Sequence, residues 1–131
     1  MERLRQRLEL AEQALRSLQE LASLDGPSPI ERDAAIQRFE CTFEAAWKAC
    51  QRFLLVREGL DTGSPKSCIR AAAQAGLLSS EETQRALEMA DDRNLTAHTY
   101  NEGLAKAIFG RLARHAATMS SWLDAMQQRL A

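Results

Sequence analysis

Hydrophobic side chains recur every three or four residues near the start of the chain, and charged side chains fill the positions between them. This spacing places the apolar residues on one face of an α-helix. The pattern therefore predicts an amphipathic helix from about Glu2 to Ser23. Its apolar face comprises Leu4, Leu8, Ala11, Leu15, Leu18 and Ala22.

A break at DGPSPIE, residues 25–31, ends this first helix and starts a second one. Ser28 is followed by a proline and, three positions later, by Glu31, which is a strong signal for a helix N-terminus. The apolar spacing then predicts a long helix from about Pro29 to Glu58. Its core-facing positions are Ile36, Phe39, Phe43, Ala46 or Trp47, Cys50 and Leu54.

The same signals divide the rest of the chain. A serine and proline start a short helix over about 65–75, and Ser79 with Glu82 starts a fourth helical segment. Asn101 is expected to cap a last long helix that ends near Arg129. We therefore expect an all-α protein, an antiparallel up-and-down four-helix bundle with an additional short helix, as one domain over residues 1–131. The apolar stripe of the last helix is Leu104, Ile108, Leu112, His115, Met119, Trp122 and Met126.

Composition adds little to the predicted fold, but it argues against some classes of function. The net charge is −1, so the chain has no general electrostatic attraction for nucleic acid. No stretch approaches the roughly 20 apolar residues of a membrane span, and the first residues lack the apolar core of a signal peptide. We therefore expect a cytoplasmic protein that does not enter a membrane.

The three cysteines give no sign of a disulfide framework, because their number is odd and their spacing is not paired. Cys41 and Cys50 are nine residues apart on one predicted helix, which places them on opposite faces. With Cys68 they are expected to be small apolar fillers. No phosphate-binding loop, metal site or cofactor site is visible in the sequence.

Polar side chains concentrate in DDRNLTAHTYNEGL, residues 91–104. On an uninterrupted helix Arg93 and His98 would point about 140° apart, whereas Asn94 and His98 would share a face. The segment is rich in residues that compete for backbone hydrogen bonds. We therefore expect a fray or turn between Thr96 and Asn101, where the arginine can meet the imidazole or two copies of the chain can pool these residues.

Such a group has the chemistry for cleaving RNA without a metal. A neutral His98 can take the proton of a 2′-hydroxyl, and Arg93 can bind the phosphate bidentately. Asn94 can orient either group, and Tyr100 can donate a hydrogen bond or stack on a base. From the spacing alone, however, a capping or buried histidine and an ordinary surface pair between the arginine and a neighbouring aspartate are the more common arrangement. His115, on an apolar stripe, is expected to be structural.

Two stretches together carry a family resemblance: AIQRFECTFEAAWKAC, residues 35–50, and DDRNLTAHTYNE, residues 91–102. They resemble the HEPN superfamily, and more closely its branch of nucleotidyltransferase substrate-binding proteins. The intervening SPKSCIRAAAQAGLL, residues 64–78, looks like the same branch. The family pattern of arginine, four residues, histidine, one residue and tyrosine is met by Arg93, His98 and Tyr100.

The resemblance implies a helical bundle that forms a homodimer or higher oligomer, with this motif in a cleft at the dimer interface. It also implies a partner, a minimal nucleotidyltransferase encoded by a neighbouring gene. In related HepT-type toxins, the arginine and histidine catalyse metal-independent RNA cleavage, and the antitoxin adenylylates the tyrosine. By carry-over, Arg93 and His98 are candidate catalytic residues, Asn94 and Tyr100 candidate substrate-binding residues, and Tyr100 a candidate adenylylation site.

The resemblance leaves three functions open. The first is a ribonuclease toxin of a two-gene toxin–antitoxin-like module. The second is a non-catalytic subunit that binds a substrate or nucleotide for the nucleotidyltransferase, since similar bundles form half of aminoglycoside nucleotidyltransferases. The third is a purely structural dimerising bundle.

Overall fold

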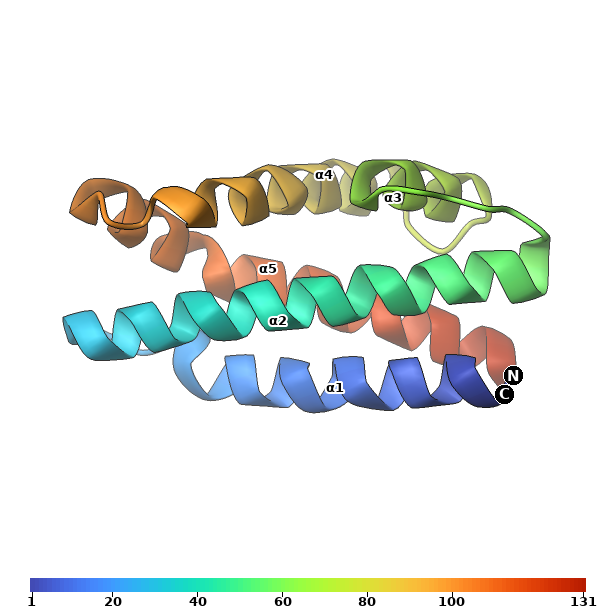
Figure 1. Cartoon of the computed structure of the whole chain (residues 1–131), viewed down its shortest axis with the longest axis horizontal. Helices are drawn as coiled ribbons and strands as arrows, with labels where there is room; N and C mark the ends of the chain where they lie inside the picture. The colour runs from blue at the N-terminus through green and yellow to red at the C-terminus, as the bar shows by residue number, and fades with distance from the viewer.

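The computed structural model describes all residues 1–131 and contains helices only (Figure 1). The all-α prediction is confirmed, and the helix ends lie close to the expected positions. A π-helical turn over Leu54–Glu58 continues the second helix, and a 3₁₀ turn over Thr96–His98 follows the fourth. The five α-helices are α1 (Glu2–Ala22), α2 (Pro29–Phe53), α3 (Pro65–Gln74), α4 (Ser80–Leu95) and α5 (Glu102–Leu130).

Side-chain caps explain why the later helices begin where they do. The hydroxyl of Ser28 accepts a hydrogen bond from the amide of Glu31 at 3.1 Å, and the carboxylate of Glu31 accepts one from the amide of Ser28 at 2.9 Å. Ser79 and Glu82 form the same reciprocal pair at the start of α4. Each pair satisfies two backbone N–H groups that the helix leaves free. Asn101 caps α5 through the amide of Leu104 at 3.0 Å.

The helices pack in two groups around α2. Figure 1 shows α2 between α1 and the pair formed by α3 and α4, and α5 packs against α1, α2 and α4. The two chain termini lie at one end of the bundle, and the turn between α4 and α5 lies at the other. This topology places the polar segment 91–104 at an end of the molecule.

One hydrophobic cluster contains apolar side chains from all five α-helices. All six positions of the predicted stripe on α1 are buried, as are the predicted core positions of α2. Of the predicted stripe on α5, only Leu104 is partly exposed. The helical period in the sequence therefore predicted which faces form the core.

The cysteines divide into two buried side chains and one exposed side chain. Cys50 and Cys68 are fully buried, as expected of apolar fillers, and all three thiols are free. The same expectation is wrong for Cys41, which is exposed on α2. Cys41 and Cys50 do lie on opposite faces, and the face with Cys41 is the one turned away from the core.

No helix is both long enough and apolar enough to span a membrane.

Candidate functional site

The polar segment forms the turn between α4 and α5. α4 ends at Leu95, three residues form a 3₁₀ turn, and α5 begins at Glu102, which confirms the predicted interruption between Thr96 and Asn101. The hydroxyl of Thr96 lies 2.6 Å from the carbonyl oxygen of Arg93, and the hydroxyl of Thr99 donates to the carbonyl of Thr96 at 3.2 Å. Such side-chain bonds replace backbone helix bonds and favour a turn.

The side chain of Arg93 points toward α2 and forms an ion pair with Glu40. Its Nη1 lies 3.4 Å from Oε2 of Glu40 and donates to the hydroxyl of Thr96 at 3.1 Å. The same hydroxyl lies 3.1 Å from Oε2 of Glu40. The side chains of Arg93 and Glu40 are each 33% exposed, so the pair is accessible to a ligand. The sequence indicated no role for Glu40, although this residue belongs to the stretch 35–50 that carried the resemblance.

His98 and Tyr100 lie together on the surface of the turn. The hydroxyl of Tyr100 is 3.4 Å from Nδ1 of His98, and the two rings meet edge to face with centroids 5.9 Å apart. Tyr100 is 85% exposed, and His98 and Asn94 are exposed as well. No hydrogen bond joins Arg93 to His98 within the single chain: Arg93 bonds to Thr96 and pairs with Glu40, and His98 lies beside Tyr100.

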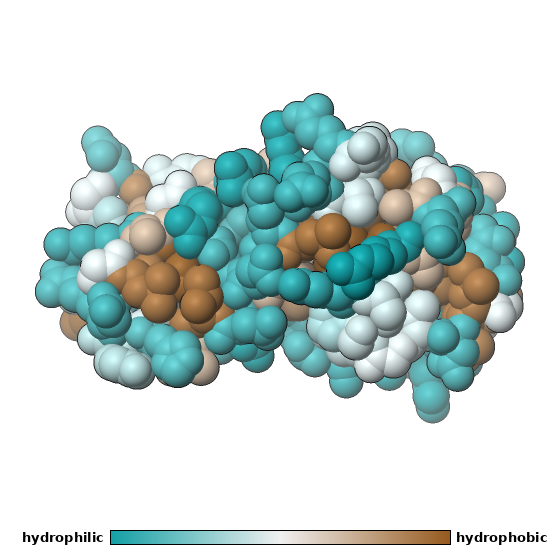
Figure 2. All heavy atoms as spheres, turned by 90° about the horizontal axis from the view of Figure 1, so that it is seen from above, coloured by the Kyte–Doolittle hydropathy of each residue, from teal (hydrophilic) through white to brown (hydrophobic).

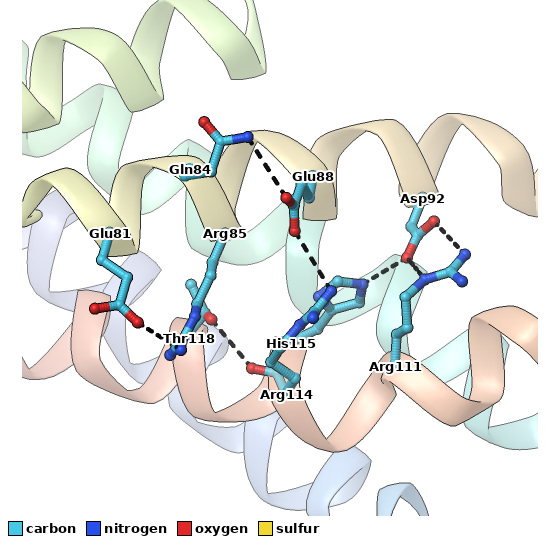
Figure 3. A network of polar contacts seen from close by, with 9 residues as sticks. All are labelled: Glu81, Gln84, Arg85, Glu88, Asp92, Arg111, Arg114, His115 and Thr118. Atoms are coloured by element: carbon cyan, nitrogen blue, oxygen red, sulfur yellow. Dashed lines mark hydrogen bonds and ion pairs between the residues drawn. The ribbon is translucent and has the colours of Figure 1, made fainter.

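A buried ionic network lies directly beside Arg93 in the sequence and ties α4 to α5 (Figure 3). The carboxylate of Asp92 accepts hydrogen bonds from Nε and Nη2 of Arg111, both at 2.8 Å. The imidazole Nε2 of His115 lies 2.7 Å from the same carboxylate. Asp92 is buried, and His115 is fully buried against the ring of Phe39. The predicted structural role of His115 therefore has a partner that the sequence did not reveal.

This network also corrects the expected surface pair between Arg93 and a neighbouring aspartate. Asp91 pairs with Lys66 at 2.6 Å, and Asp92 pairs with Arg111. The signal in the sequence was the spacing of Arg111 and His115, which are four residues apart and hence on one face of α5. Arg93 pairs instead with Glu40, a residue distant in the sequence.

The charges of the network follow from burial and hydrogen bonding. Burial raises the pKa of Asp92, but the hydrogen bonds from Arg111 and His115 outweigh it and lower the pKa below its usual value. Burial lowers the pKa of His115, and the bond to Asp92 offsets this only in part. His115 is therefore neutral near pH 7 and donates its Nε2 proton to an ionised Asp92. Its other ring nitrogen, Nδ1, is buried without a hydrogen-bond partner.

A cavity of about 580 Å³ lies next to this turn, between α1, α2 and the end of α4. Arg93 lines it together with basic, acidic and apolar side chains of α1 and α2. His98 and Tyr100 do not line it. No group of three or more His, Cys, Asp or Glu side chains is arranged to hold a metal ion.

The fold and the polar turn define a class of helical bundle with known members. Residues 6–128 match the family described as nucleotidyltransferase substrate binding protein like. The chain belongs to this family, which confirms the resemblance inferred from residues 35–50 and 91–102. No curated protein matches the chain.

Several solved structures share the fold. A protein of Thermus thermophilus is 59% identical, with a TM-score of 0.87 over 88% of this chain and 98% of that chain. A tri-AMPylated Shewanella oneidensis HEPN toxin in complex with an MNT antitoxin is 14% identical, with a TM-score of 0.77 over 95% of this chain and 96% of that chain. A Haemophilus influenzae protein with the fold of a nucleotidyltransferase substrate-binding domain is 22% identical, with a TM-score of 0.75 over 92% of this chain and 98% of that chain.

Proposed function

We propose that this chain is the helical partner of a minimal nucleotidyltransferase in a two-gene module. The family match over residues 6–128 supports this proposal. Two structures with the same fold also support it, a HEPN toxin bound to an MNT antitoxin and a substrate-binding domain of a nucleotidyltransferase. In this proposal the polar turn between α4 and α5 is the site of function.

Within that module, we propose a metal-independent ribonuclease. The observation that carries this proposal is the exposed imidazole of His98, which sits on a 3₁₀ turn five residues from an arginine and 3.4 Å from the Tyr100 hydroxyl. An exposed imidazole at a turn is accessible to an RNA strand, whereas the buried His115 is not.

The proposed reaction needs only side chains of the turn. His98 removes the proton of a ribose 2′-hydroxyl, and the oxygen attacks the adjacent phosphorus. The bond from phosphorus to the 5′-oxygen breaks, this oxygen takes up the proton now carried by His98, and a 2′,3′-cyclic phosphate remains. Arg93 stabilises the negative charge that develops on the phosphoryl oxygens. Asn94, which is exposed, and Tyr100 contact the strand.

This proposal includes a dimer, because Arg93 and His98 of one chain have different partners. In an up-and-down bundle that pairs through the end bearing the α4–α5 turn, one copy supplies His98 to the Arg93 of the other. The exposed apolar side chains at this end support such pairing: Ile30 is 82% exposed and Leu95 39%. Figure 2 shows a hydrophobic area toward the same end, the left of the view, bordered by hydrophilic side chains.

We also propose that the partner regulates the chain by adenylylating Tyr100. The phenolic oxygen would attack the α-phosphorus of ATP, pyrophosphate would leave, and the phenolic proton would pass to a base. The 85% exposure of Tyr100 supports access by a second protein. The transferred AMP would place a bulky anionic group beside His98 and block the cleft.

A cleavage assay tests the ribonuclease. Purified, unmodified chain is incubated with RNA in the presence of a chelator, and the products are examined for cyclic phosphate ends. We expect cleavage by the wild type and none by His98→Ala, while Gln84→Ala, an exposed change elsewhere on α4, cleaves normally. Intact RNA at high concentrations of folded protein would contradict the proposal.

The second candidate is a non-catalytic subunit that binds a substrate or nucleotide. One observation favours it: Arg93 lines the 580 Å³ cavity, whereas His98 lies outside it. In this case Arg93→Ala weakens binding of a nucleotide or of the nucleotidyltransferase in calorimetry, and no RNA is cleaved. Binding of neither by the wild type would exclude this candidate.

A further inference from the structure

The cavity between α1, α2 and the end of α4 is unusual for the cations that face it. Arg7 comes from α1, Lys48 from α2 and Arg93 from α4, so three separate helices contribute a cation to one place. Glu40, which pairs with Arg93, and Glu44 also line the cavity. The volume of about 580 Å³ lies within the range of sites that hold small molecules.

Two of these cations have no acidic partner. Arg7 and Lys48 are partly buried and form no ion pair, although several other basic side chains of the chain are paired. The Nζ atom of Lys48 lies 5.8 Å from the centroid of the Trp47 ring. Removing a cation partly from water without a counter-charge is unfavourable. An anionic ligand would supply that counter-charge to both side chains.

Arg93 adds an unused hydrogen-bond donor at the same site. Its Nη1 contacts Glu40 and Thr96, but its Nε is buried and has no hydrogen-bond partner. Buried donors are seldom left unpaired, because the loss of water is not compensated. A small shift of the guanidinium toward a ligand oxygen would satisfy this group.

The remaining walls suit the uncharged parts of a nucleotide. Leu10, Cys41 and Ala45 form an apolar side, and Leu10 is 61% exposed. A flat base or a sugar would cover this exposed leucine. Glu44 also lines the cavity and has no ion pair or hydrogen-bonded partner, so its carboxylate is free to accept hydrogen bonds from ribose hydroxyls.

We propose that this cavity binds a nucleoside phosphate. Phosphate oxygens contact Arg7, Lys48 and Arg93, the ribose lies at Glu44, and the base packs on Leu10 and its apolar neighbours. The inference rests on the proposed function only in that Arg93 belongs to both sites. It adds Arg7 and Lys48 as binding residues, and neither is part of the motif on the α4–α5 turn.

A second cavity adjoins the first and would accommodate the rest of a longer ligand. It measures about 360 Å³, shares Glu44 and Arg93 with the first and reaches Lys66 at the start of α3. The same nucleoside phosphate chemistry therefore fits either a free nucleotide or one segment of a single RNA strand. The two sources are separated by experiment.

Binding is measured by calorimetry on the full chain with two probes. One probe is ATP, and the other is a short single-stranded RNA with 2′-O-methyl groups, which cannot be cleaved. We expect at least one to bind, and raised salt to weaken it. Arg7→Ala and Lys48→Ala should each weaken binding at least about tenfold, as for a lost charged hydrogen bond. Tighter binding of ATP identifies a free nucleotide, and tighter binding of RNA identifies a strand.

Matched controls distinguish binding at this cavity from a general effect of the net charge of the protein. Arg16→Ala removes the same charge nine residues from Arg7, on the opposite face of α1, and Lys106→Ala removes a lysine that pairs with Glu102 on α5. Both should bind as the wild type does. Absence of binding of both probes at millimolar concentration, or equal affinity in Arg7→Ala and Lys48→Ala, would overturn the proposal.

The outcome is also distinct from that of the cleavage assay. His98 does not line the cavity in the single chain, so the affinities of Arg7→Ala and Lys48→Ala report on the nucleotide site, and the cleavage by His98→Ala reports on the ribonuclease. A chain that binds but never cleaves RNA leaves the nucleotide site in place and removes only the ribonuclease. If the chain cleaves RNA but Arg7→Ala and Lys48→Ala bind the probes as the wild type does, the ribonuclease stands and the nucleotide site is removed.

Discussion

Asp92 on α4 and His115 on α5 are joined through Oδ2 and Nε2 at 2.7 Å, inside the bundle. Asp92 immediately precedes Arg93, and it is held a second time by the guanidinium of Arg111. The last turn of α4 is therefore fixed to α5 at the residue before the candidate site. This anchor lets the following residues leave the helix without releasing Arg93 from its place beside Glu40.

Neutralising Asp92 should destabilise the fold. Asp92→Asn leaves Arg111 without its counter-charge, and breaking such a buried pair typically costs about 3–5 kcal/mol. Because the Arg111 side chain is 36% exposed, we expect a smaller loss of about 2 kcal/mol in the free energy of unfolding. Urea denaturation measures it. The control Asp91→Asn breaks an exposed pair with Lys66 and should cost less than about 1 kcal/mol; equal losses would argue against the anchor.

The stability of the fold should fall as the pH drops below about 6.5. The pKa of His115 is lowered by burial in the folded state, so the unfolded chain takes up this proton first and gains stability relative to the folded chain. The loss continues until the pH reaches the lowered pKa. His115→Gln keeps a donor for Asp92 but does not titrate, and should flatten this part of the curve of unfolding free energy against pH. Gln84→Ala, at an exposed position of α4, should retain the wild-type slope.

A second loss of stability is expected in more acidic solution. The pKa of Asp92 is depressed in the folded state, so its contribution is complete above the unfolded value of about 4 and declines as the pH falls through the folded value. Asp92→Asn should lack this acid-dependent contribution in the same measurement. If the unfolding free energy of the wild type and of Asp92→Asn declined identically at acidic pH, Asp92 would not be the group responsible.

The cap of α4 should contribute measurably to stability. Ser79→Ala removes the acceptor for the amide of Glu82, and we expect a loss of about 1 kcal/mol in the free energy of unfolding. Ser80 is the next residue, is exposed and is not the cap, so Ser80→Ala should change stability by no more than about 0.5 kcal/mol. Thermal unfolding followed by circular dichroism distinguishes the two.

Glu40 should influence cleavage and nucleotide affinity in opposite directions. Glu40→Gln removes the charge that holds Arg93, so the guanidinium loses its fixed position and RNA cleavage should fall about tenfold or more. The same change makes the cavity more positive, and affinity for the probe that binds there, ATP or the uncleavable RNA, should rise. Glu81→Gln, which alters an exposed pair with Arg85, serves as the control and should affect neither. A parallel fall in both quantities would indicate damage to the fold.

Tyr100 should be the residue that the partner modifies. With ATP and the nucleotidyltransferase, the intact mass of the wild type should increase by whole AMP groups, and the mass of Tyr100→Phe should not change. RNA cleavage by unmodified Tyr100→Phe should remain within about tenfold of the wild type, because His98 and Arg93 are retained. Modification that persists in Tyr100→Phe would place the acceptor elsewhere.

Local signals made most of the fold predictable. The helical period identified the buried face of α1 at all six positions, and the capping serines Ser28 and Ser79 located helix starts to the residue. The turn after Leu95 was also predictable, because threonine and asparagine side chains compete locally for backbone bonds. These features depend on neighbours within four residues, which the sequence displays directly.

The contacts between helices could not be derived in the same way. That Arg93 meets Glu40, and that Asp92 rather than Asp91 is buried, depend on the rotation and register of α4 against α2 and α5. The cavity was likewise invisible, since Arg7 and Lys48 are distant in the sequence from the motif that drew attention.

The exposure of Cys41 has a practical consequence. Cys50 and Cys68 are fully buried, so a maleimide fluorophore added to the folded protein would attach at Cys41 alone. The dye would then stand at the wall of the cavity, and its emission would report occupancy in real time with the natural sequence intact. The chain thus carries its own attachment point for an optical sensor.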